Sequence, residues 1–402
     1  MKGFIISLSL SLILLSGCWS GRELADILIG VALGIDLVDD QYQVTLQVLD
    51  PAEVAANEGT STRSTITNYT VTADTLFEAI RQLTVTTPRK VFLSHLRLLV
   101  YGEELAREGI GDTLDFLLRD HEIRSDFVIT VAKGLSAKDV LGIMSPLEKT
   151  LAEKVYTSIE SSERNWASTQ RVELDELMDS ILSNGKEAVL TGVSVRGDIE
   201  KGKEQSSVER TSPLALVYVD SLGVLKHDQL IGWLTREESQ GLNFVVDNVQ
   251  NTVEHIDWPE GGTITLELIR NQTKMDVSAK DDQVKVKLSV STIANIGDVA
   301  ANVSIRDLET LSEIEKHLGD KLKDLMQSTI DVAQKEQIDI FGFGDQLRRQ
   351  DPKAWTALEK NWPEAFANAE ISYDMLIEIR QSGMVTDPFD REFQKKLDEK
   401  KN

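Results

Sequence analysis

Residues 283–333 read QVKVKLSVSTIANIGDVAANVSIRDLETLSEIEKHLGDKLKDLMQSTIDVA, and the spacing of apolar residues changes partway along this stretch. At its start, Val284, Val286 and Leu288 alternate with lysine or serine, which predicts a β-strand with one face in water. From residue 305 onward, apolar positions recur every three or four residues over nearly thirty residues, namely at Ile305, Leu308, Leu311, Ile314, Leu318, Leu322, Leu325, Thr329 and Ala333. We therefore predict a helix of roughly 40 Å packed across a sheet, in a chain of the α+β class.

The sequence before this stretch predicts more strands, and the sequence after it predicts a shorter helix. Strand-like runs precede it, and the glycines around Phe341 and Phe343 are expected to end the helix before a shorter one. We predict that residues 213–385 form a C-terminal half and that residues 386–402 form a solvated tail. The strand-like runs are 252–258 and 263–280, short strands with turns at 220–223 and 227–228 are expected within 213–246, and the shorter helix is expected at 352–362.

The N-terminal half, residues 18–200, also mixes strands and helices. It is predicted to begin with a hairpin that turns at Asp39-Asp40 and to have a possible internal break near residue 135. With mixed or antiparallel sheets, this gives about three subdomains in all. Residues 197–212 are charged and rich in turn-forming residues, so we expect a linker or long loop there. Helices are expected at 73–85, 112–120, 136–146, 147–162 and 171–186, strands at 90–102, 126–132 and 188–197, and a polar surface loop at 52–67.

The charge balance excludes several kinds of partner. The 402 residues include 43 Lys and Arg against 66 Asp and Glu, a formal net charge of −23, spread along the chain. Nucleic acid is therefore not an expected partner, and a basic membrane-binding surface is not expected either. The single cysteine excludes an internal disulfide framework.

No catalytic, cofactor-binding or metal-binding motif is found in the sequence. The five histidines are not spaced as helical zinc ligands, and no phosphate-binding or dinucleotide-binding fingerprint follows a predicted strand. We therefore expect no catalytic residue, no metal and no cofactor. His95 and Arg97 share one predicted strand, and we interpret them as a buried hydrogen-bonded pair.

The only cysteine, Cys18, directly follows an export signal. Residues 4–15 are apolar behind Lys2, a length typical of a signal peptide and too short to span a bilayer. The next residues, Leu15-Ser16-Gly17-Cys18, resemble the processing site of a bacterial lipoprotein. We predict that residues 1–17 are removed and that acyl chains are attached to the Cys18 thiol, which anchors the protein in the lipid bilayer.

Four segments of the chain resemble blocks of one protein family. They are CWSGRELADILIGVALGIDLVDDQYQVTLQVLDP (18–51), SHLRLLVYGEELAREGI (94–110), LIGWLTREESQGLNFV (230–245) and DIFGFGDQLRRQDPKAWTAL (339–358). The matching residues are Cys18, Trp19, Arg22, Glu23, Gly34 to Asp36, Pro51, His95, Arg97, Gly102 to Glu104, Gly232 to Leu234, Glu237, Gly241, Phe341 to Gly344 and Trp355. In content and order these blocks resemble the Ger(x)C family, the C-subunit lipoproteins of bacterial spore germinant receptors.

This resemblance implies a fold of three α+β subdomains and a role without catalysis. The expected partners are the A and B subunits of the receptor, which are integral to the inner spore membrane. The expected location is the outer face of that membrane, and the expected process is nutrient-triggered spore germination. Trp19, Arg22 and Glu23 lie close to the lipidated residue in sequence, so they are candidates for contact with headgroups or with a partner subunit.

Two other functions share some of these features. A solute-binding lipoprotein of an importer would carry the same anchor, but it would fold as two doubly wound lobes with a ligand between them. A surface hydrolase would need catalytic residues that the sequence does not offer.

Overall fold

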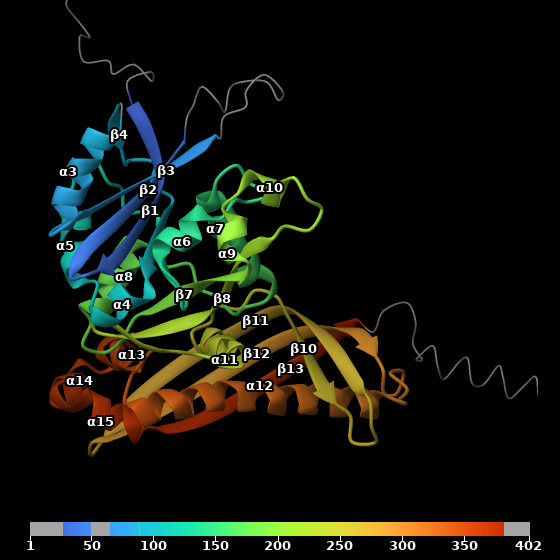
Figure 1. Ribbon diagram of the computed structural model, residues 1–402. Helices are drawn as coiled ribbons and strands as arrows, with labels where there is room; N and C mark the ends of the chain where they lie inside the picture. Colours follow the sequence, from blue (N-terminus) through green and yellow to red (C-terminus); the bar gives the residue numbers. More distant parts are fainter. Residues whose placement is uncertain (1–26, 50–64, 88, 382–402) are drawn as a thin grey trace, which may run out of the picture.

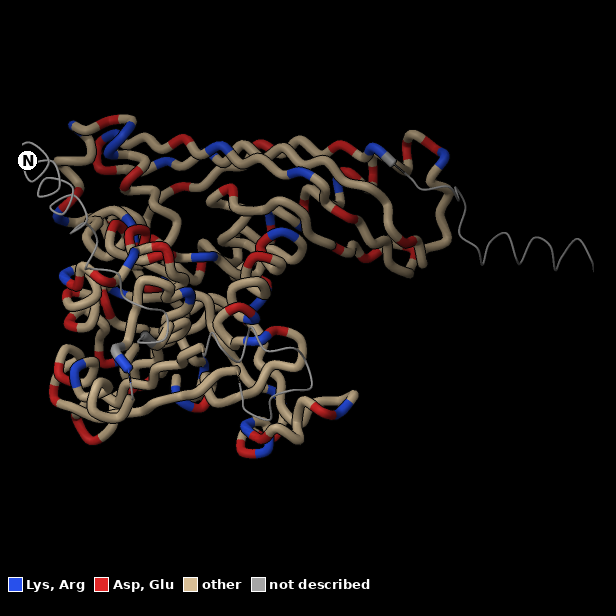
Figure 2. The backbone as a smooth tube through the Cα atoms, turned by 90° about the horizontal axis from the view of Figure 1, so that it is seen from above, with Lys and Arg blue, Asp and Glu red and all other residues tan. Residues whose placement is uncertain are grey.

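The computed structural model describes residues 27–49, 65–87 and 89–381, which form two β-sheets with helices packed around them (Figure 1). Both sheets are mixed, so the predicted α+β class is confirmed. The second sheet and its long helix extend to one side of the first sheet and its helices (Figure 2). Acidic and basic residues alternate over both parts of the tube in this view, without a basic stripe.

The first sheet has a parallel centre with antiparallel strands on both sides. Strands β1, β5, β6 and β7 are parallel, β2 and β3 extend the sheet beyond β1, and β8 and β9 extend it beyond β7. The predicted hairpin turns at Asp39 and Asp40, which both have positive φ, as a type I′ turn requires. The strands are β1 (Ile27–Val38), β2 (Gln41–Leu49), β3 (Ile66–Ala73), β4 (Lys90–Phe92), β5 (Leu98–Gly102), β6 (Val128–Ala132), β7 (Val189–Gly197), β8 (Ala215–Lys226) and β9 (Gln229–Trp233).

Helices cover both faces of this sheet. On one face, apolar residues such as Leu83, Leu117 and Leu177 form one buried cluster with the strands. On the other face, residues such as Leu141 and Ile159 form a second cluster. The helices of the first face are α3 (Leu76–Thr86), α4 (Glu103–Glu108), α5 (Gly111–Arg119) and α8 (Leu174–Ile181), and those of the second are α6 (Ala137–Gly142), α7 (Leu151–Asn165) and α9 (Ile199–Gly202), with α10 (Gln205–Val208) following α9.

The second sheet carries the long helix that the change of spacing predicts. Helix α12 (Leu308–Glu336) has 29 residues, a length of about 43 Å, and it buries Ile314, Leu318 and Leu322 against the strands. Short helices follow it at one end of the sheet (Figure 1). The sheet order is β10 (Thr252–Asp257), β11 (Thr263–Lys280), β12 (Gln283–Val299) and β13 (Glu370–Gln381), and the short helices are α13 (Phe343–Gln350), α14 (Pro352–Leu358), a 3₁₀ turn (Glu359–Asn361) and α15 (Trp362–Ala367).

Helix α11 (Arg236–Val245) joins the two sheets. Its N-terminus is fixed by a capping box between Thr235 and Glu238. Gln240 and Asn243 donate hydrogen bonds to the carbonyls of Trp166 and Ala167, which follow α7, at 2.9 and 2.8 Å. The third buried cluster contains Val189 and Leu222 of the first sheet together with the core of the second, so this cluster spans both sheets.

Several local predictions are corrected by the structure. Residues 236–245 form a helix rather than strands, and the predicted strand 90–102 is two strands, β4 and β5, with an irregular segment between them. Residues 197–212 include two short helices, and Ser207 among them is buried. The division of the chain near residues 200–212 stays a prediction. Strands β8 and β9, which follow this segment, belong to the first sheet.

The crossing of α11 and α12 gives a test of the packing. A Cβ at Gly241 would lie 2.2 Å from Thr329 Oγ1 and 2.4 Å from the Leu325 carbonyl, so the helices would have to separate. We expect Gly241→Ala to lower the free energy of unfolding by about 2 kcal/mol, measured by urea denaturation. Gly232→Ala is the control, because a Cβ there would meet no described atom within 4 Å. Equal stability of the two variants would contradict this packing.

Candidate functional site

Three motif residues of the N-terminal half, Asp36, Gly102 and Glu103, lie at one edge of the first sheet. The parallel strands β1, β5 and β6 all end there, and ligands of α/β sheets bind at such carboxyl ends. Asp36 lies near the end of β1, Gly102 ends β5, and Lys133 follows β6. This edge is therefore a candidate functional site.

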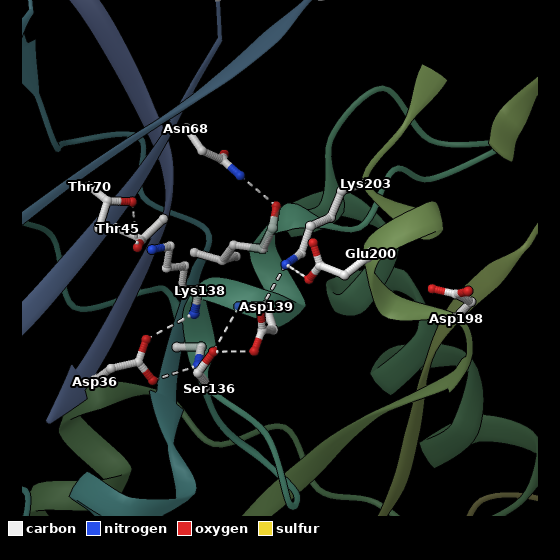
Figure 3. A network of polar contacts seen from close by, with 12 residues as sticks. Asp36, Thr45, Asn68, Thr70, Ser136, Lys138, Asp139, Asp198, Glu200 and Lys203 are labelled. Carbon is white, nitrogen blue, oxygen red and sulfur yellow. Dashed lines mark hydrogen bonds and ion pairs between the residues drawn. The ribbon is translucent and has the colours of Figure 1, made fainter. Parts of the chain in front are cut away.

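Asp36 is a buried carboxylate that holds the start of α6. It accepts hydrogen bonds from the backbone N–H groups of Ala137, at 2.6 Å, and Lys138, at 2.9 Å (Figure 3). Burial raises the pKa of Asp36, while these two bonds favour its charged form. Gly102 has to lack a side chain here, because a Cβ would lie 2.1 Å from Asp36 Oδ1.

The polar network continues along α6 to β2, β3 and α9. Lys203 Nζ donates to Asp139, at 2.8 Å, and to Glu200, at 2.6 Å (Figure 3). The amides of Gln47 and Asn68 both donate to the carbonyl of Leu141, near the C-terminal end of α6. Helix α6 is thus fixed at both ends by groups that are distant in sequence.

A second network joins the end of β5 to β9. Glu103 accepts hydrogen bonds from the Gly134 N–H, from Trp233 Nε1, at 3.2 Å, and from Arg107 Nε, at 3.0 Å. Burial opposes the charged form, but these donors hold the pKa of Glu103 below its usual value. Lys133 Nζ lies 5.1 Å from the centre of the Trp233 ring and donates to Ser221 Oγ, at 2.9 Å.

A third carboxylate, the buried side chain of Asp339, organises the FGFG segment after α12. Asp339 accepts hydrogen bonds from the four successive N–H groups of residues 341–344 and from Trp362 Nε1, at 3.0 Å. Burial raises its pKa to about 6, although these donors favour the charged form. The rings of Phe341 and Phe343 stack with their centres 5.0 Å apart, inside the core.

These three networks bind the chain to itself. Asp36, Glu103 and Asp339 each accept hydrogen bonds from several donors, so these carboxylates have the geometry of structural joints rather than of an acid or base facing a substrate. Within residues 27–49, 65–87 and 89–381, no group of three or more His, Cys, Asp or Glu side chains could hold a metal ion. In the same residues, no helix is long and apolar enough to cross a bilayer.

The predicted site residues fall into two groups. Cys18, Trp19, Arg22 and Glu23 lie outside the described residues. The interpretation of His95 and Arg97 as a buried pair is wrong, because both side chains are exposed. They lie in or beside the irregular segment between β4 and β5, where Arg97 packs on the Tyr156 ring, and His95 packs against Phe92.

Sequence reasoning missed Lys133 and Glu254. Lys133 lies in a short loop without any motif. Glu254, in β10, is only 5% exposed, and no described residue offers its Oε1 a hydrogen bond. The sequence offered one signal for the burial of Glu254. It lies two residues before Ile256, on the same face of the strand.

Two family models match most of the chain. The model described as "Spore germination protein N-terminal domain" matches residues 20–195, and the model described as "Spore germination B3/ GerAC like, C-terminal" matches residues 220–383. The three carboxylate networks draw residues from both matched regions.

Full-length relatives and a solved structure agree with these matches. Spore germination protein KC of Bacillus subtilis (strain 168) is 28% identical over 393 residues, which cover 96% of each chain. Spore germination protein B3 of the same organism is 25% identical over 93% of this chain and 96% of that protein. The crystal structure of the GerBC protein has the same fold, with a TM-score of 0.54 and 22% identity over 86% of this chain and 96% of that chain.

The Asp36 joint can be tested against an exposed helix cap. Asp36→Asn would place an NH₂ group against one of the two backbone donors, so we expect the free energy of unfolding to fall by about 2 kcal/mol. Asp198 caps α9 from an exposed position, asparagine caps helices equally well, and the exposed ion pair with Lys201 adds little, so Asp198→Asn should leave the urea midpoint almost unchanged. Similar midpoints for the two variants would show that the hydrogen bonds of Asp36 add nothing to the free energy of unfolding.

Glu254 should make stability depend on pH. Burial raises its pKa from 4.5 to about 7, Lys321 acts in the opposite direction, and Glu237 adds to the rise. The folded state holds the Glu254 proton more tightly than the unfolded state does. The free energy of unfolding therefore keeps its full value below pH 4.5 and falls as the pH rises from 4.5 to about 7. We expect Glu254→Gln to be more stable than the natural chain by about 2 kcal/mol at pH 8, and by less at pH 5.

Urea denaturation of both proteins from pH 5 to pH 8 checks this expectation. Glu260→Gln, in an exposed turn, is the matched control and should follow the natural chain at every pH. A constant difference between Glu254→Gln and the natural chain across this range would contradict the shifted titration.

Proposed function

The chain belongs to the Ger(x)C family of spore germination proteins, and we propose that it is the lipid-anchored C subunit of a spore germinant receptor. The observation that carries this proposal is the coverage of both halves by the family models, together with 28% identity to spore germination protein KC over nearly the whole of both chains. The proposed process is nutrient-triggered germination.

The anchor is the Cys18 thiol, placed directly after the signal sequence. Two or more acyl chains, at about 0.8 kcal/mol per buried CH₂ group, would hold the protein on a bilayer without help from its acidic surface. Only eight residues lie between Cys18 and the start of β1 at Ile27, so the folded body would lie within about 30 Å of the lipidated residue. Trp19, Arg22 and Glu23 would then meet headgroups or a partner subunit.

The subunit would act through protein contacts rather than catalysis. The motif residues Asp36, Glu103 and Asp339 serve as joints in the fold, which leaves the outer surface for partners. The proposed partners are the A and B subunits, which are integral to the inner spore membrane. The proposed place of the chain is the outer face of that membrane.

The alternative of an importer's solute-binding lipoprotein disagrees with the fold. Such a protein would have two doubly wound lobes with parallel sheets. Here the second sheet is antiparallel except for β13, and one long helix covers it. A hydrolase has no support from the three networks, whose carboxylates are all occupied by donors of the chain itself.

Removing the thiol tests the anchor and the function together. We expect Cys18→Ala to move the protein from the membrane fraction of spores to the soluble fraction, because no acyl chain can be attached. Spores with only this variant should respond to nutrients several-fold more slowly, measured by the fall in optical density.

Ser20→Ala is the control, since it changes a neighbouring residue and keeps the thiol. The thermal unfolding of the soluble variant should equal that of the body released from the natural protein, which excludes misfolding. Membrane retention of Cys18→Ala, with residues 1–17 shown by mass spectrometry to be absent, would contradict the anchor, and a normal response from soluble protein would contradict the proposed role.

A further inference from the structure

A groove of about 950 Å³ lies between α3, α5 and the end of the β1–β2 hairpin, away from the three carboxylate networks. One wall is a stripe of α3 with helical spacing, formed by Phe77, Ile80, Arg81 and Thr84. The other wall is a stripe of α5 with the same spacing, formed by Asp112, Asp115, Phe116 and Arg119. Both helices lie on the same side of the first sheet (Figure 1).

The interior of the groove is apolar and partly open. Phe77 is 54% exposed, although it is a large aromatic residue, and its ring meets Phe116 edge-on with the centres 5.9 Å apart. The remaining apolar lining comes from Leu37, Tyr42, Leu76, Ile80, Val91 and Leu93. An exposed aromatic residue within an apolar groove is typical of a docking surface.

The rim of the groove is acidic. Six carboxylates line it, from Asp40, Asp74, Asp112, Asp115, Asp120 and Glu122, against two arginines and His121. Arg119 is already paired with Asp115 at 2.8 Å, and Arg81 lies over the Phe77 ring. Burial and the nearby charge of Asp112 both raise the pKa of Tyr42, as a negative potential inside the groove would.

We propose that this groove binds an amphipathic helix of a partner protein, with apolar residues on one face and lysine or arginine along both flanks. Two helical walls around an apolar floor fit a third helix, whose anchors recur every three or four residues. The eleven residues of α3 span about 16 Å, which is the length of three turns. The acidic rim selects a basic partner, and it disfavours a second copy of this chain, whose net charge is −23.

A labelled peptide provides the test. The probe is a helical peptide of about fifteen residues, with leucines every three or four positions and lysines elsewhere, and its comparison peptide alternates the same residues. The protein is the mature chain, residues 18–402, with Cys18→Ala, which lacks both the signal segment and the acyl chains and so needs no detergent. We expect fluorescence anisotropy to show that the helical peptide binds about ten-fold more tightly than the alternating one.

Two pairs of variants locate the binding site. Phe77→Ser should weaken the helical peptide about ten-fold, whereas Leu118→Ser, on α5 but outside the groove and 49% exposed, should not. Asp40→Asn with Asp112→Asn should weaken binding and reduce its salt dependence. The control with the same change of charge is Asp257→Asn with Asp276→Asn, on exposed positions of the second sheet.

Each of the following results would overturn the proposal. Equal binding of the two peptides, or unchanged affinity in Phe77→Ser, would leave only general attraction to an acidic protein. A dimer in sedimentation that Phe77→Ser dissociates would assign the groove to a second copy. A chain ending at residue 385 that binds the peptide much more tightly than the full chain would assign the groove to the tail. Unchanged thermal unfolding of each variant excludes loss of the fold as the cause.

Discussion

A carboxylate that accepts hydrogen bonds from backbone N–H groups is the interaction on which this structure depends. Asp36 holds the start of α6, Glu103 holds the loop after β6, and Asp339 holds four successive N–H groups of the FGFG segment. A chain with 66 acidic residues and 43 basic ones cannot pair every carboxylate with a cation. Backbone donors solve this problem in the interior, because each satisfies the charge and fixes a loop at the same time.

The sequence predicted those elements whose pattern is local. The change of apolar spacing after residue 300 predicts both β12 and α12, and paired aspartates mark the β1–β2 hairpin. Helix α11 was missed because Ser239, Gln240 and Asn243 are buried with its apolar residues, so no one-sided stripe exists. The only sequence signal for this helix was its capping box, formed by Thr235 and Glu238. Strand β13 was missed although its pattern is also local, because Ile371, Tyr373 and Met375 alternate with polar residues and pack against the core of the second sheet.

The joints could be predicted only in part. The family resemblance drew attention to Asp36, Gly102 and Glu103, yet it could not say that a Cβ on Gly102 would strike the Asp36 carboxylate. Asp36 and Ala137 are 101 residues apart, and no spacing rule connects them. His95 and Arg97 show the opposite error, since alternation within one assumed strand placed them together. The break between β4 and β5 removes that alternation and exposes both side chains.

Other hydrogen bonds to the first sheet bear on how this protein would meet a partner. The N-terminus of α5 is held by Asp228, in the β8–β9 turn, which accepts from the Gly111 N–H at 2.9 Å, and by the bond between Thr113 and Tyr101 in β5. The groove wall on α5 is therefore set by the first sheet before any partner arrives. A preformed wall loses little conformational entropy on binding, so a modest apolar contact is enough for a stable complex. On the proposed lipid anchor, the body would gain from rigidity of this kind, because the anchor would leave its orientation free and the surface itself would supply the specificity.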